Sequence, residues 1–81
     1  SVLREAVRRE PRDSGARTNL GQALLAQGRA SDAVAEFEAA LAANPRQAEA
    51  HEGLAQAYTK LGRIDLADEH RRAASRLRAS R

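Results

Sequence analysis

The chain has 81 residues, a formal net charge of +3 and 42% apolar residues, most of which are alanine and leucine. So short a chain can build only one compact unit with a thin core, and we expect a single domain. Cysteine is absent, which excludes a disulfide framework, a thiolate metal site and a thiol nucleophile. No apolar run approaches the roughly 20 residues that span a bilayer, and no apolar block follows the arginine-rich start as in a secretory signal.

The positive charge is concentrated near the end of the sequence. Residues 63–81 hold six arginines against three acids, whereas residues 14–62 carry a net charge of −1 and residues 1–13 a net charge of +1. These features do not determine the cellular compartment, although a cytoplasmic location is favoured. The preference for arginine over lysine and the abundance of alanine are typical of a GC-rich bacterial genome.

The first expected helix covers about residues 1–9. Its apolar residues are Val2, Leu3, Ala6 and Val7. A helix this short is marginal by itself, so it must pack on the helix that follows. Pro11 lies in the turn after it, where the missing N–H costs nothing.

The next two expected helices cover about residues 15–27 and 31–43. Apolar residues recur in both at helical spacing, namely Leu20, Ala23 and Leu24, then Ala33, Phe37, Ala40 and Leu41. Gly28 stands where the first of these helices must stop, a position that favours a left-handed backbone and therefore glycine. Only two or three residues separate the helices, which forces an antiparallel hairpin.

The last two expected helices, at about 48–61 and 65–78, repeat this pattern 34 residues later. The matching pairs are Pro11 and Pro45, Leu20 and Leu54, Gly28 and Gly62, Ala33 and Ala67, and Ala40 and Ala74. Five coincidences in one register indicate an internal repeat. Predicted caps or first-turn residues are Asp13 or Ser14, Ser31 and Asp65. Gly53 is the awkward residue, because a glycine inside a helix costs about 1 kcal/mol relative to alanine.

With this period the sequence resembles the tetratricopeptide repeat family, whose unit is a helical hairpin of about 34 residues. In residues 14–47 the family pattern is matched by Leu20, Gly21, Leu24, Gly28, Ala33, Phe37, Ala40 and Pro45, and only Arg17 departs. In residues 48–81 it is matched by Leu54, Ala55, Tyr58, Gly62, Ala67 and Ala74, while His51, Arg71 and Ala79 depart. Residues 1–13 fit the second half of a preceding unit through Leu3, Ala6 and Pro11.

The resemblance implies an all-α superhelical solenoid of about five helices. Its units are a half repeat at 1–13, a repeat at 14–47 and a repeat at 48–81 with a terminal capping helix. Arg71 stands where Phe37 stood one unit earlier, so we expect Arg71 to lie exposed on that last helix.

The resemblance also implies a protein-interaction scaffold whose concave face binds a peptide or a partner protein. The family's concave positions correspond here to Thr18, Asn19, Gln22, Leu25, Glu49, Glu52, Gln56 and Thr59. Because two of these residues are acidic, we expect a neutral or basic peptide rather than an acidic one. The carboxylate clamp of chaperone-binding members is matched by Asn19 alone, so that role is not carried over.

Two alternatives stay open. The first is a structural or oligomerising segment, since the half repeat at 1–13 leaves an apolar flank that is a candidate surface for a homodimer. The second is a basic nucleic-acid-binding module, suggested by the arginines of the last helix. These are Arg71, Arg72, Arg76, Arg78 and Arg81. Against it, Phe37 and Tyr58 take core positions, which leaves no exposed aromatic ring to stack on a base.

No pattern predicts an enzyme, a cofactor or a metal site. The serines have no positioned base, and the glycines do not form a phosphate-binding loop. His51 and His70 lie 19 residues apart on different predicted helices without further ligands beside them. We expect His51 to pack at a helix junction and His70 to be solvated.

Overall fold

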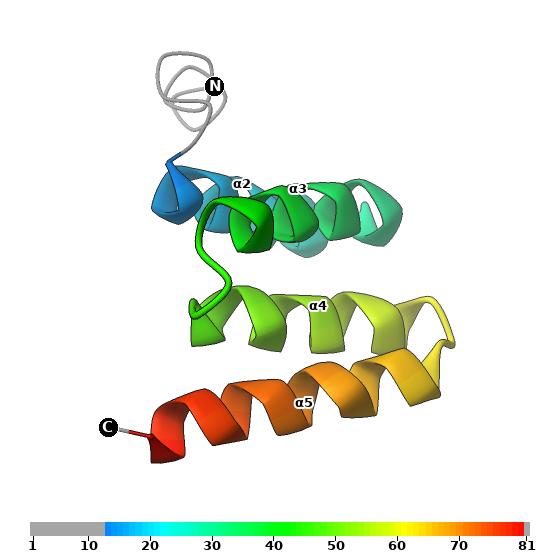
Figure 1. Cartoon of the computed structure of the whole chain (residues 1–81). Helices are drawn as coiled ribbons and strands as arrows, with labels where there is room; N and C mark the ends of the chain where they lie inside the picture. Colours follow the sequence, from blue (N-terminus) through cyan, green and yellow to red (C-terminus); the bar gives the residue numbers. More distant parts are fainter. Residues whose placement is uncertain (1–12, 81) are drawn as a thin grey trace.

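The structure, a computed structural model, describes residues 13–80. This part of the chain consists of α2 (Ser14–Ala26), α3 (Ala30–Ala43), α4 (Ala48–Lys60) and α5 (Ile64–Ala79) (Figure 1). The all-α prediction is confirmed, and the ends of these four helices agree with the predicted ends to within about one residue. The expected helix at 1–9 and its homodimer surface lie outside the described residues. Within residues 13–80, no helix combines the length and apolar character that crossing a membrane requires.

Each hairpin turns through the same hydrogen-bonded cap. Gly28 and Gly62 follow the first helix of each pair and have φ angles of +80° and +77°. In the first turn, the N–H of Arg29 donates to the Leu24 carbonyl at 2.9 Å, and the equivalent bond from Arg63 to Tyr58 is 2.8 Å. Glycine adopts this left-handed backbone without steric cost, so the prediction for Gly28 and Gly62 is confirmed.

The helix starts differ in how they are capped. Asp13 is the N-cap of α2, and its carboxylate accepts a hydrogen bond of 3.1 Å from the N–H of Ala16. Helices α3 and α5 begin after Arg29 and Arg63, whose side chains make no capping bond. Ser31 and Asp65 therefore lie in the first turns of their helices and are not N-caps.

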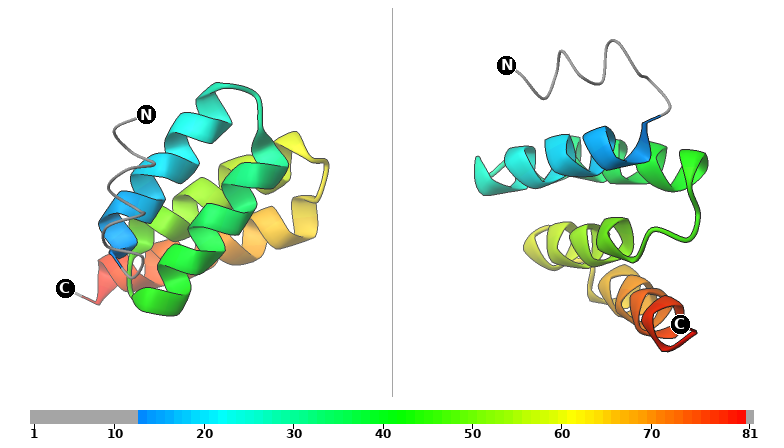
Figure 2. Two further views of the ribbon diagram at one scale, coloured as in Figure 1. Left: turned by 90° about the horizontal axis from the view of Figure 1, so that it is seen from above. Right: turned by 90° about the vertical axis from the view of Figure 1, so that its left-hand side faces the viewer.

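The two hairpins stack as successive layers (Figures 1 and 2). Helix α3 packs on α4, and α2 makes a smaller contact with α4 on the same side. Phe37 fills the centre of this stack and is fully buried, together with Leu54. Ala33, Ala40, Ala67 and Ala74 are buried where the helices of each hairpin cross. Small residues at such crossings let the helix axes approach closely.

Candidate peptide-binding groove

Helices α2 and α4 border an open depression of about 390 Å³. It is lined by Gln22, Leu25, Ala26, Gln56 and Lys60. Three of these, Gln22, Leu25 and Gln56, belong to the predicted binding set, and the structure brings them together. We call this depression the groove.

The spacing along each helix explains why these residues share one surface. Residues three or four apart in a helix lie on one face. Gln22 is followed by Leu25 and Ala26 on α2, and Gln56 is followed by Lys60 on α4. The sequence analysis did not predict Ala26 and Lys60 as lining residues, although the same i, i+4 spacing places them beside Gln22 and Gln56.

The lining of the groove combines an apolar leucine with two amides. Leu25 is 8% exposed and belongs to the hydrophobic core, whereas the side chains of Gln22 and Gln56 are exposed. The two glutamines are 34 residues apart and therefore hold the same position in successive repeats. An amide side chain both donates and accepts hydrogen bonds, as a peptide backbone requires of its partner.

Two other predicted residues of α2 contribute little to the groove. Thr18 is 3% exposed, and its hydroxyl oxygen has no hydrogen-bond partner among the described residues. A ligand on the surface would not reach this hydroxyl. Asn19 is exposed one turn before Gln22 and does not line the depression.

The predicted acidic residues, Glu49 and Glu52, do not line the groove. The carboxylate of Glu52 accepts a hydrogen bond of 2.9 Å from Nε of Arg78 and lies 2.8 Å from its terminal Nη2. Glu49 lines a separate depression together with Arg46 and Arg78. The charge of Glu52 is thus balanced by Arg78, and the charged residue that lines the groove is Lys60.

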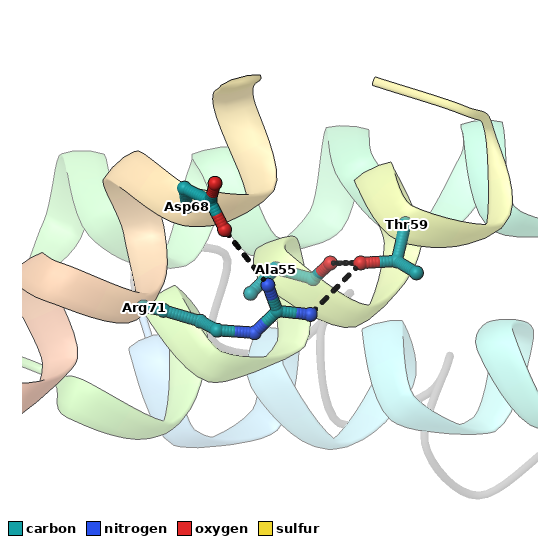
Figure 3. Close-up of polar contacts among 4 residues, drawn as sticks. All are labelled: Ala55, Thr59, Asp68 and Arg71. Carbon is teal, nitrogen blue, oxygen red and sulfur yellow. Dashed lines mark hydrogen bonds and ion pairs between the residues drawn. The ribbon is translucent and has the colours of Figure 1, made fainter. Parts of the chain in front are cut away.

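Thr59 is bound to α5 (Figure 3). Its hydroxyl donates to the Ala55 carbonyl at 2.8 Å and accepts a bond of 3.1 Å from Arg71. Arg71 also pairs with Asp68 at 3.0 Å, and its side chain is 55% exposed. The exposure predicted for Arg71 is confirmed. Thr59 links α4 to α5 and does not line the groove.

The arginines of α5 do not form one uniform basic surface. Arg71 and Arg78 are held in ion pairs with Asp68 and Glu52. Arg72 and Arg76 are exposed and make no ion pair within residues 13–80. Phe37 is fully buried and Tyr58 is half-buried, so this part of the chain presents no fully exposed aromatic ring for a nucleic-acid base.

The two histidines are in contact, which no sequence pattern predicted. Nδ1 of His51 lies 2.9 Å from Nδ1 of His70, and the ring of His70 stacks on Tyr58. His51 packs at a helix junction, as predicted. The prediction that His70 is solvated was wrong, because its ring is half-buried between α4 and α5. Burial lowers the pKa of His70, and the neighbouring His51 lowers the pKa further.

Comparison with known proteins decides the family. A family model described as Tetratricopeptide repeat matches residues 1–38 and 18–80. The chain belongs to the tetratricopeptide repeat family. This repeat is a protein-interaction fold that is typically non-enzymatic. A search of curated protein sequences gives no match.

Solved structures of a protein named MamA are similar to this tetratricopeptide chain. MamA AMB-1 P212121 is 29% identical with a TM-score of 0.89, over 98% of this chain and 43% of that chain. MamA MSR-1 C2 is 28% identical with a TM-score of 0.88, over 96% and 45% respectively. MamA D159K mutant 1 is 31% identical with a TM-score of 0.85, over 93% and 44%. The chain therefore spans less than half the length of these MamA chains.

Proposed function

We propose that this chain is a protein-interaction scaffold that holds a peptide segment of a partner protein in the groove between α2 and α4. The observation that carries the proposal is that Gln22, Gln56 and the apolar Leu25 line the same depression. An extended peptide that enters the groove can bond its backbone to the two amides and place an apolar side chain on Leu25. The area is small, so the affinity is weak.

The charge of the groove favours a neutral or acidic peptide. The expectation of a neutral or basic peptide relied on Glu49 and Glu52, but Glu52 is paired with Arg78 and neither glutamate lines the groove. Lys60 lines it instead. Because Lys60 is exposed, its contribution to selectivity is modest, at most about 1 kcal/mol.

The experiment is a binding screen with fluorescent peptides of neutral, acidic and basic composition, followed by titration of the best peptide against variants. Gln22→Ala and Gln56→Ala should each weaken binding about five- to tenfold, the loss of about one hydrogen bond. Gln27→Ala is the matched control, since Gln27 is an exposed glutamine just beyond α2 that does not line the groove. Lys60→Glu should shift the preference from acidic toward basic peptides.

Three outcomes separate this proposal from the alternatives. Binding that is unchanged by both glutamine variants would place the partner elsewhere on the chain and contradict the proposal. Absence of any peptide binding, together with self-association that Val7→Arg abolishes, would favour the structural or oligomerising role; Val7 lies outside the described residues. Affinity for an oligonucleotide that falls steeply with salt and is lost in Arg72→Ala and Arg76→Ala would favour the nucleic-acid role.

A further inference from the structure

The contact between His51 and His70 joins two nitrogens of the same kind. Nδ1 of His51 lies 2.9 Å from Nδ1 of His70, while the ring centroids are 5.2 Å apart, so the two nitrogens meet head-on. One ring must donate its Nδ1–H to the lone pair of the other, because two bare nitrogens or two N–H groups would repel each other. The pair is therefore an N–H···N hydrogen bond between α4 and α5.

This hydrogen bond tolerates one added proton but not two. The donor ring carries its hydrogen on Nδ1 and has a lone pair on Nε2, and the acceptor ring has the opposite arrangement. A first proton can enter at Nε2 of the donor ring, which keeps the bond and makes it charge-assisted. A second proton can enter only at the acceptor nitrogen, inside the contact. Two N–H groups on two cationic rings then face each other, and the bond is lost.

Helix α5 has little apolar packing to hold it in place. Among the helices of residues 13–80 it packs on α4 alone, and its buried residues are Ala67 and Ala74. Alanine side chains bury little apolar surface, so the polar contacts with α4 carry more of the attachment. These contacts are the histidine pair, Arg78 with Glu52, and Arg71 with Thr59. Among these residue types, histidine is the one whose charge ordinarily changes between pH 5 and 8.

We propose that the histidine pair is a pH-sensitive latch, which holds α5 on α4 at neutral pH and releases it when both rings are protonated. The groups that surround His70 come from three helices. Tyr58 of α4 stacks on its ring, and the Tyr58 hydroxyl reaches the carboxylate of Glu38 on α3 at 3.5 Å. Glu69 is the neighbour of His70 on α5. Burial and the neighbouring His51 lower the pKa of His70, and they outweigh the opposite effect of Glu69 and Glu38.

The lowered pKa of His70 fixes the direction of the pH dependence. In the unfolded chain the rings are apart and take up protons near pH 6.5, the ordinary value for histidine. In the folded chain His70 takes up its proton only at lower pH. The stability that the latch contributes is therefore fully present above about pH 6.5 and is lost as the pH falls through the lowered pKa. Glu52, next to His51, is paired with Arg78 and does not face this contact alone.

The test is urea denaturation of the full chain at several values between about pH 5 and 7. The sequence holds no other histidine, so the pair is the only source of a histidine effect. We expect the wild-type urea midpoint to fall as the pH is lowered. A double variant, His51→Gln with His70→Gln, should lose most of this dependence, because glutamine takes up no proton. Arg72→Gln, an exposed change on the same helix, is the control and should keep the wild-type dependence.

Nuclear magnetic resonance tests the latch without relying on a variant. Nitrogen-15 spectra of the histidine rings at neutral pH should show one ring protonated at Nδ1 and the other at Nε2. As the pH falls to about 5, the amide signals of α5 should change before those of α2 and α3. None of these residues lines the groove, so the result is independent of peptide binding. Two rings that are both protonated at Nε2, equal pH dependence in the wild type and the double variant, or simultaneous loss of all four helices would overturn the proposal.

Discussion

The ring of Phe37 on α3 lies directly against the backbone of Gly53 on α4, at a point where a β-carbon would collide with the ring. The same ring borders Gly21 on α2, where an added β-carbon would stand 2.7 Å from the ring carbon Cε1. Phe37 is thus enclosed between two glycines from different repeats. This contact explains why a glycine, which is unfavourable inside a helix, stands at position 53.

Gly53→Ala should destabilise the fold although alanine is the better helix former. The gain in helix propensity is about 1 kcal/mol, whereas overpacking a filled core costs about 1 to 3 kcal/mol. The ring cannot withdraw, because Gly21 blocks its other side. We expect a net loss of up to about 2 kcal/mol in the free energy of unfolding, measured by urea denaturation.

Two comparisons check the cause of that loss. Gly15→Ala is the control, since the nearest atom to its added β-carbon is a carboxylate oxygen of the exposed Asp13 side chain at 3.3 Å, and it should destabilise the chain less than Gly53→Ala does. Combining Gly53→Ala with Phe37→Leu should be less damaging than the sum of the two changes. Strict additivity of the pair would show that Phe37 is not the obstacle.

Enlarging a buried alanine at a helix crossing should also destabilise the fold. Ala40 is fully buried and sits where the repeat pattern requires a small residue. Ala40→Leu should lower the free energy of unfolding by about 1 to 3 kcal/mol. Ala42→Leu, two residues along the same helix and exposed, should change it by less than about 0.5 kcal/mol. Equal effects from the two substitutions would contradict the assigned packing.

The turn between α4 and α5 should tolerate side-chain bulk but not a change in backbone preference. Nothing lies within 4 Å of a β-carbon built on Gly62, yet its φ angle is +77°. Gly62→Ala should therefore cost about 1 to 2 kcal/mol from backbone strain alone. Gly62→Asn should cost less, because asparagine adopts the left-handed region more readily. Thermal unfolding of both variants measures the difference, and an alanine variant as stable as the wild type would contradict the cause.

Arg71→Leu should change solubility more than stability. The ion pair with Asp68 is exposed and worth about 1 kcal/mol at most. The new leucine would lie two turns from Ile64, which is 52% exposed on the same helix, and would enlarge an apolar surface. Light scattering over a range of concentrations should show association that Arg72→Leu causes less strongly. A stability loss above about 2 kcal/mol would show that Arg71 has a larger structural role.

The sequence by itself determined the helices, their hairpin turns and their stacking order. These follow from short-range rules: apolar residues at spacings of three and four, a glycine where each first helix ends, and a period of 34 residues. Gln22, Leu25 and Gln56 were predicted from the resemblance to the family, whose concave positions they match, and the structure places them along one depression.

Only the tertiary structure decided which partners the remaining side chains have. Glu52 pairs with Arg78 across 26 residues, and His51 meets His70 across 19, because α4 and α5 run antiparallel at a particular angle and offset. A shift of one helical position would separate both pairs, and no local pattern specifies that offset. The burial of Thr18 was not predicted for the same reason, because it results from the packing around this residue and not from its polar character. Contacts between helices depend on how the helices cross, and that geometry is set by the whole core.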